Sequence, residues 1–130
     1  MSTDTSTQPA EPSVFTLIID RAIPADIVFE NDRVIAFKDN APKAPVHLLV
    51  VPKTQQYRDV VELAAGDPAL LAEMVATAQR IASDPELMQG ATPGQFRLIF
   101  NTGEAVGQTV FHVHAHVLAG NLEEGSLAHS

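Results

Sequence analysis

The chain has 130 residues, 45% of them hydrophobic, which is enough apolar material for the core of one ordinary domain. Its 16 acidic and 8 basic residues give a formal net charge of −8, so it lacks the positive surface of a general nucleic-acid or anionic-membrane binder. It contains no cysteine, which excludes disulfides, thiolate catalysis and cysteine-based zinc sites.

The first segment, residues 1–13, is rich in Ser, Thr, Pro and acidic side chains, a composition that predicts a disordered tail. It has no basic start and no apolar run, so it does not match a secretory signal. No later segment has the run of apolar residues needed to span a bilayer. We therefore expect a soluble, cytoplasmic protein that does not bind membranes.

The next elements alternate short apolar runs with turn-forming residues. Residues 14–23 predict a short helix that ends before Pro24. The runs 27–29 and 34–37 flank a turn-forming cluster and predict a β-hairpin. Residues 47–51 form a continuous apolar run rich in branched side chains, which favours a buried strand.

The clearest predicted helix follows. Asp67 is a suitable N-cap, and Pro68 lies where a first-turn proline is tolerated. Apolar residues then recur at helical spacing, typical of a face that packs into a core or a subunit interface: Leu70, Leu71, Met74, Val75, Ala78, Ile81 and Ala82. Two further runs, 95–100 and 109–118, predict strands.

Together these elements predict one α+β domain over residues 14–120, followed by a C-terminal tail over 121–130. Its centre would be a five-stranded, mainly antiparallel sheet, with one long and one short helix. We find no internal repeat and no convincing linker between domains.

Three of the five histidines lie two residues apart near the C-terminus, at His112, His114 and His116. If this segment is a strand, the three side chains share one face, because alternate residues point the same way. The residues that alternate with them would then pack into the core on the opposite face: Phe111, Val113, Ala115 and Val117.

Several interpretations of this pattern remain open. The histidines could be structural, on a polar sheet face. They could bind a metal, although the first and third Cα atoms of a flat strand lie about 13 Å apart, so three imidazoles on one ion would need a bent strand. The third interpretation is covalent phosphoryl transfer, because a neutral imidazole is a good nucleophile near pH 7 and a neighbouring imidazolium can stabilise phosphate oxygens or donate a proton.

The segment before the histidines supports phosphate chemistry. Residues 101–109 contain two glycines, whose backbone N–H groups can approach an anion, and end in the hydroxyl of Thr109. Taken alone, such a loop is usually only a turn between strands.

At this point the sequence resembles the histidine triad (HIT) family, in particular its Hint branch of nucleoside phosphoramidases. The family signature of alternating histidine and apolar residues is met by His112 to Leu118, and the resemblance extends from about Phe15 to Gly120. Further matching segments occur in order along the chain: 23–25, 36–39, 44–47, 50–53, 101–103 and 107–110.

The resemblance implies a role for each matching residue near the phosphate. His114 would attack the α-phosphorus and form a nucleotidyl-histidine intermediate, and His116 would hydrogen-bond a non-bridging oxygen. His112 and His47 would orient the catalytic imidazole. Thr109, at a position usually held by serine, would lie near the leaving group.

The resemblance also implies a nucleotide pocket. Asp39 would bind the ribose hydroxyls, and further residues would line the phosphate site or wall the base pocket: Asn101, Gly107 and Gln108 for the phosphate, and Phe15, Ile18 and Phe37, with Val14, for the base. From the residues alone, His47 is better interpreted as a satisfied core histidine, Asp39 equally well as the start of a turn, and the apolar residues equally well as core.

The expected function is therefore hydrolysis of purine nucleoside 5′-phosphoramidates or aminoacyl-nucleotides, by a homodimer, without metal or other cofactor and without nucleic acid as partner. Two alternatives stay open. One is hydrolysis of a dinucleoside polyphosphate on the same fold, and the other is nucleotide binding or scaffolding with incidental catalysis.

Overall fold

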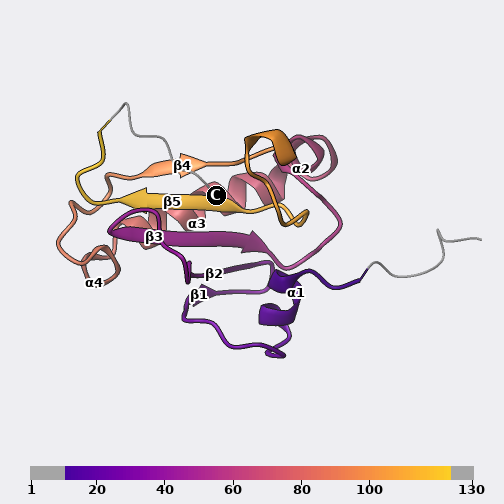
Figure 1. Ribbon diagram of the computed structural model, residues 1–130, viewed down its shortest axis with the longest axis horizontal. Coiled ribbons are helices and arrows are strands. Elements are labelled where there is room, and N and C mark those ends of the chain that lie inside the picture. Colours follow the sequence, from indigo (N-terminus) through magenta and orange to yellow (C-terminus); the bar gives the residue numbers. More distant parts are fainter. Residues whose placement is uncertain (1–10, 124–130) are drawn as a thin grey trace, which may run out of the picture.

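A five-stranded antiparallel sheet forms the centre of the computed structural model, which describes residues 11–123 (Figure 1). The strands are β1 Ile27–Glu30, β2 Val34–Lys38, β3 Val46–Pro52, β4 Arg97–Ile99 and β5 Ala115–Ala119. Their order across the sheet is β1-β2-β3-β5-β4, and every neighbouring pair is antiparallel. The predicted five-stranded α+β fold is confirmed, whereas residues 1–10 and 124–130 of the two predicted tails lie outside the described residues.

The helices are α1 Val14–Ile19, α2 Val60–Gly66, α3 Pro68–Ala82, α4 Pro85–Met88 and a short 3-10 helix, η2 Glu104–Val106. The sequence predicted only α1 and α3. Asp59 caps α2 and Asp84 caps α4, each accepting from a backbone N–H in the first turn. Neither helix is long enough for its apolar residues to show a helical period, which is why both were missed.

Helix α1 is shorter than predicted. It ends at Ile19, and Arg21 adopts a left-handed conformation with φ of 62°. The chain therefore leaves the helix before it reaches Pro24. Its beginning is also defined, because Ser13 is its N-cap, and so residues 11–13 of the predicted tail are ordered.

The long helix α3 packs against one face of the sheet, contacting β2, β3 and β5, and lies behind these strands in Figure 1. Asp67 is its N-cap and Pro68 its first residue, as predicted. Most of the predicted apolar stripe is buried. Val75 is an exception at 42% exposed, because it faces away from the sheet, and Leu71 is only half-buried.

Strand β5 begins at Ala115, not at Thr109, so the prediction that His112 and His114 lie within a strand is wrong. Ala115 pairs with Val50 of β3, and the same register would place Val113 opposite Pro52. Proline has no N–H with which to continue the ladder. The backbone N–H of Val113 instead donates to the carbonyl of Tyr57.

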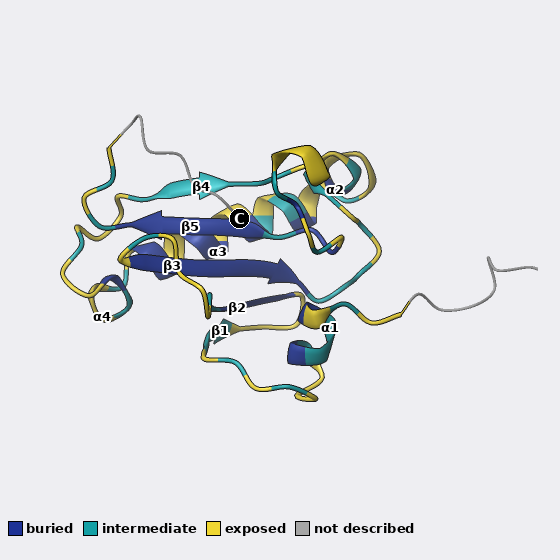
Figure 2. Ribbon diagram, viewed as in Figure 1, coloured by how far each residue is buried: buried dark blue, intermediate teal, exposed yellow. Residues whose placement is uncertain are grey.

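Side chains alternate between the two faces of β3 and β5, and both strands are buried along their whole length (Figure 2). Val113, Ala115 and Val117 join the core beneath α3, as predicted. Phe111 does not, since it is 43% exposed on the segment that precedes the strand. Within residues 11–123 no helix is long and apolar enough to cross a membrane.

Candidate active site

A cavity of about 470 Å³ lies on the face of the sheet opposite α3. One end is apolar, with Phe15 and Ile18 of α1 facing Phe37 and Leu49 of the sheet. The other end is polar and contains His114, His116 and Asp39. A cavity with one apolar end and a few convergent polar groups suits a small ligand that is itself half apolar and half polar.

His114 lies at the junction between the two ends. Its ring centroid is 4.9 Å from that of Phe15 and 5.1 Å from that of His116. Its Nδ1 is 2.9 Å from the backbone carbonyl oxygen of His112. Because a carbonyl can only accept, Nδ1 carries the proton and Nε2 keeps its lone pair whenever the ring is neutral. Burial lowers the pKa of His114, so the neutral form predominates at pH 7.

His112 is fully buried and does not line the cavity. Its Nε2 lies 2.8 Å from the carbonyl oxygen of Pro52 and therefore donates. Its Nδ1 lies 2.7 Å from the hydroxyl of Ser13. Burial lowers the pKa of His112, and a neutral ring uses both nitrogens in these two hydrogen bonds. Because its side chain is held at both nitrogens, His112 also fixes its own backbone carbonyl, which accepts the hydrogen bond from His114 Nδ1.

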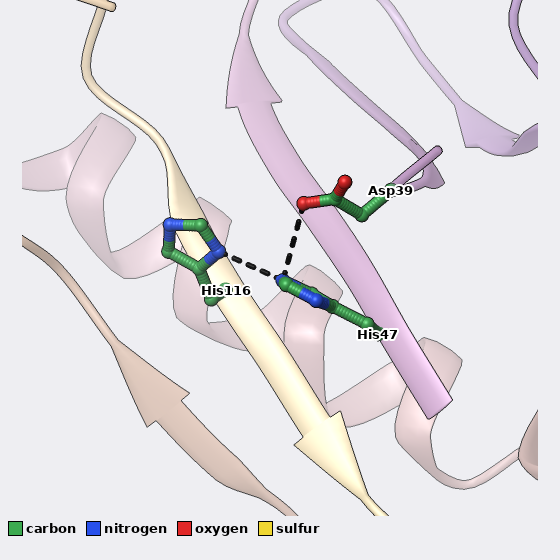
Figure 3. A group of neighbouring side chains, drawn as sticks. All are labelled: Asp39, His47 and His116. Atoms are coloured by element: carbon green, nitrogen blue, oxygen red, sulfur yellow. Dashed lines mark hydrogen bonds and ion pairs between the residues drawn. The ribbon is translucent and has the colours of Figure 1, made fainter. Parts of the chain in front are cut away.

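His47 on β3 and His116 on β5 form the second histidine pair (Figure 3). The backbone N–H of Lys43 donates to His47 Nδ1 over 2.9 Å, so the proton of a neutral His47 lies on Nε2. That Nε2 is 2.9 Å from His116 Nδ1 and 3.3 Å from a carboxylate oxygen of Asp39. His47 therefore donates its one N–H to His116, and the Asp39 carboxylate lies beside the same nitrogen.

This arrangement fixes the tautomer of His116. Since its Nδ1 accepts from His47, its proton lies on Nε2, a buried atom that has no hydrogen-bond partner among the described residues. Leaving a buried donor unpaired costs free energy, so such an atom indicates a place where a ligand binds. Burial, together with His114 and His47, lowers the pKa of His116 to about 4, so the ring is neutral at pH 7, unlike the imidazolium considered above.

The only cluster in the described chain with metal-site spacing is Asp39, His47 and His116. Its hydrogen bonds do not suit a metal. His47 Nε2 carries the proton because Nδ1 is occupied by the N–H of Lys43, and a protonated nitrogen has no lone pair to coordinate an ion. His116 Nδ1 is already occupied by that proton. In place of a metal site, His47 and His116 form a hydrogen bond in which the proton lies on His47, and Asp39 lies beside it.

The loop of residues 101–109, which contains two glycines, borders the cavity through Gly107 and Thr109. Gly107 has φ of 97°, a conformation that side chains disfavour. Gln108 is buried behind the loop. Its amide donates to the carbonyls of Arg58 and Val110, and its carbonyl accepts from the N–H of Gly103. Gln108 therefore holds the shape of the loop.

The structure thus brings most of the predicted residues to one cavity. Its lining includes, from the prediction, Val14, Phe15, Ile18, Phe37, Asp39, His47, Gly107, Thr109, His114 and His116. Asn101 and Gln108 do not line it, so their contact with a ligand stays a prediction. His112 does not line it either, and its predicted role is to orient His114. Sequence reasoning missed Ser13 and the backbone N–H of Lys43. A serine before an apolar helical segment is an N-cap signal, whereas nothing in the sequence indicates the Lys43 contact.

The chain is similar to known proteins over most of its length. A family model described as the HIT domain matches residues 20–122. The chain is 46% identical over 111 residues to an uncharacterized HIT-like protein of Synechococcus elongatus, which covers 85% of this chain and 92% of that protein. It is 38% identical over 120 residues to the purine nucleoside phosphoramidase of Escherichia coli, which covers 92% of this chain and 97% of that enzyme.

Solved structures give the same picture. A HIT family hydrolase from Clostridium thermocellum has a TM-score of 0.78 at 39% identity, covering 92% of this chain and 98% of its own. A histidine triad protein from Clostridium difficile has a TM-score of 0.77 at 33% identity, covering 92% of this chain and 100% of its own.

Proposed function

The chain belongs to the HIT family, and we propose that it is a hydrolase that cleaves purine nucleoside 5′-phosphoramidates, or aminoacyl-nucleotides, to a nucleoside monophosphate and an amine. The observation that carries the proposal is the pairing of His114 and His116. His114 offers a lone pair on Nε2, while His116, 5.1 Å away between ring centroids, offers an unpartnered N–H.

The reaction proceeds in two displacements at phosphorus. His114 Nε2 attacks the α-phosphorus and the P–N bond breaks, so that the amine leaves with the electron pair and takes up a proton. Thr109 lines the cavity and supplies a hydroxyl through which that proton can pass from water. Water then attacks phosphorus and gives up a proton to solvent, the bond to His114 Nε2 breaks, the nucleoside monophosphate leaves, and the neutral imidazole is restored.

His116 stabilises the charge that develops during each displacement. Its Nε2–H donates to a non-bridging phosphate oxygen, in a buried position where such a hydrogen bond is strong. His47 keeps this donor in the correct tautomer by donating to Nδ1. Because these groups supply both nucleophile and electrostatic stabilisation, the mechanism uses no metal ion.

The rest of the cavity suits a purine nucleoside. Phe15, Ile18 and Phe37 provide an apolar slot for a flat base. Asp39 lines the same cavity, with a carboxylate oxygen 3.3 Å from His47 Nε2, and we assign it to the ribose hydroxyls. Its other carboxylate oxygen accepts from the N–H of Ala41, so the same side chain also shapes its loop.

The first test is steady-state hydrolysis of adenosine 5′-phosphoramidate by the wild type and by His114→Ala, with a dinucleoside polyphosphate as second substrate. We expect turnover of the phosphoramidate by the wild type only, preference for the P–N bond, and no effect of a chelator. Full activity of a folded His114→Ala variant would refute the nucleophile. Preference for the P–O–P bridge would favour the polyphosphate hydrolase, and tight nucleotide binding without turnover would favour a binding protein.

We further propose that the protein acts as a cytoplasmic homodimer. Two features support a dimer: Val75 of α3 is exposed, and β4 is an edge strand that pairs only with β5 within the described chain. Sedimentation velocity of the wild type and of Val75→Lys tests this assembly. A monomeric wild type would refute it.

A further inference from the structure

The hydroxyl of Ser13 lies between the first turn of α1 and the buried ring of His112. The reaction described above assigns no role to this hydroxyl. Its oxygen is 2.7 Å from His112 Nδ1 and accepts the backbone N–H of Thr16 over 3.1 Å. Ser13 is thus the N-cap of the helix that carries Phe15 and Ile18, and also a partner of a fully buried histidine.

In the hydrogen bond between Ser13 and His112, the available protons determine which atom donates. His112 Nε2 donates to the carbonyl of Pro52, so in the neutral ring Nδ1 has a lone pair and requires a donor. Ser13 has one hydroxyl proton. Its alternative acceptor, Thr16 Oγ1, is farther away at 3.4 Å. The proton of Ser13 therefore points to His112.

Gln55, in the loop after β3, holds Ser13 in this position. Its side-chain oxygen accepts from the backbone N–H of Ser13 over 2.8 Å and from the hydroxyl of Thr16 over 2.6 Å. Its amide donates to the carbonyl of Glu11 over 2.7 Å. A helix cap on the surface does not need three such bonds, so this clamp points to a requirement for accurate placement.

We propose that Ser13 is a positioning residue, whose hydroxyl holds the His112 ring and with it the backbone carbonyl that orients the nucleophile His114. The inference rests on the proposed function for the role of His114. The path has three hydrogen bonds: Ser13 to His112 Nδ1, His112 Nε2 to Pro52, and His114 Nδ1 to the carbonyl of His112. The same turn of α1 places the Phe15 ring 5.7 Å from His112 and 4.9 Å from His114, measured between centroids.

Three substitutions separate this role from simple helix capping. Ser13→Thr keeps both the cap and the hydroxyl donor. Ser13→Asp keeps the cap, since aspartate is as good an N-cap as serine, but a carboxylate cannot donate to Nδ1. Ser13→Ala removes both. The matched control is Asp59→Ala, which removes the N-cap of α2, a helix without cavity residues.

The experiment measures kcat and KM for adenosine 5′-phosphoramidate and thermal unfolding for all five full-length proteins. We expect kcat to fall on the order of 10- to 100-fold in Ser13→Asp and Ser13→Ala, the scale set by small misplacements of a reacting group, and to be restored in Ser13→Thr. Asp59→Ala should lower the unfolding temperature and leave kcat unchanged. A wild-type kcat in Ser13→Asp would overturn the proposal, because capping alone would then explain Ser13.

A second readout does not depend on turnover. In ¹⁵N-histidine spectra the Nδ1 resonance of His112 should move toward that of an unbonded ring nitrogen in Ser13→Ala, while Ser13→Thr retains the wild-type position. An unchanged resonance in Ser13→Ala would overturn the assigned hydrogen bond. Absence of turnover in the wild type would instead refute the proposed function, so the two failures are distinguishable.

Discussion

The two faces of the sheet are made by the same strands but differ in how completely their groups are satisfied. On the α3 face, β3 and β5 present only apolar side chains, among them Leu48, Val50 and Val117, and these pack against Met74. On the opposite face the alternate positions of β3 and β5 include His47 and His116, one of which keeps an unpartnered donor.

The difference shows that stability and function are separated by the alternation of side chains along a strand. The apolar side chains of β3 and β5 on the α3 face stabilise the fold because they are removed from water, and none of them can take part in acid–base or nucleophilic chemistry. The opposite face, which carries His47 and His116, has hydrogen-bonding groups in place of some of these apolar side chains. The buried N–H of His116 costs free energy until a ligand accepts from it. Substitutions on the two faces should therefore change different measured quantities.

Met74→Ala should give the largest loss of stability. Met74 is fully buried beneath the sheet, so its truncation leaves a cavity. We expect the free energy of unfolding to fall by about 2–5 kcal/mol, measured by denaturant titration, with kcat unchanged at temperatures where the variant is folded. A loss of kcat at full folding would show that the two faces are coupled.

His116→Phe should do the reverse. An aromatic ring is kept but the donor to phosphate is lost, while the Asp39 carboxylate, 3.3 Å from His47 Nε2, stays as a neighbour of the His47 N–H. We expect kcat/KM to fall on the order of 10²- to 10³-fold, as for removal of one preorganised donor, with little loss of stability. The matched control is Leu118→Met on the same face of β5, which should retain activity.

The pH dependence of stability distinguishes the faces without a substitution. Burial lowers the pKa of His47, His112, His114 and His116, the last to about 4. Below about pH 6.5 the unfolded chain therefore binds more protons than the native one. The free energy of unfolding should therefore be independent of these histidines above pH 6.5. It should fall as pH drops toward 4, by at most about 1.4 kcal/mol per pH unit for each proton.

Denaturant titrations at several pH values check this expectation. The rate should follow the same sign, because protonation removes the lone pair of His114. The acid limb of the kcat/KM profile should thus lie below pH 6.5. An acid limb above pH 6.5 would contradict the assigned burial of this network.

Phe111→Ser should have the smallest effect. Phe111 is 43% exposed, so we expect a change in the free energy of unfolding within about 0.5 kcal/mol by chemical denaturation. Val113, two residues later, is buried, and Val113→Ala should cost about 2 kcal/mol in the same experiment. Equal losses for the two variants would mean that Phe111 is covered in the working assembly.

Much of the fold follows from local patterns. The apolar runs of β2 and β3 and the capped, amphipathic pattern of α3 are local signals, and each is strong enough to be predicted from the sequence. The start of β5 has no such signal, because it depends on the register that brings Val113 opposite Pro52, a partner 61 residues earlier in the chain. Alternating apolar residues continue through 109–114, so the pattern alone extends the strand too far.

The candidate site shows the same limit. The spacing of the three histidines predicts that they lie close together, and the rings of His114 and His116 are 5.1 Å apart although only His116 lies in β5. The tautomers, however, depend on carbonyls and N–H groups that no pattern indicates, such as those of Pro52 and Lys43. Ser13 was assigned to the tail by composition, although its position before Val14 and Phe15 also fits a helix cap.

The most direct test of the central claim is the stereochemical course at phosphorus. A P-chiral adenosine 5′-phosphoramidothioate, hydrolysed in ¹⁸O-labelled water, reports whether phosphorus is displaced once or twice. Attack by His114 followed by attack of water gives two inversions, and the account predicts net retention of configuration. Net inversion would mean that water attacks the substrate directly, and would contradict the role of His114 as nucleophile.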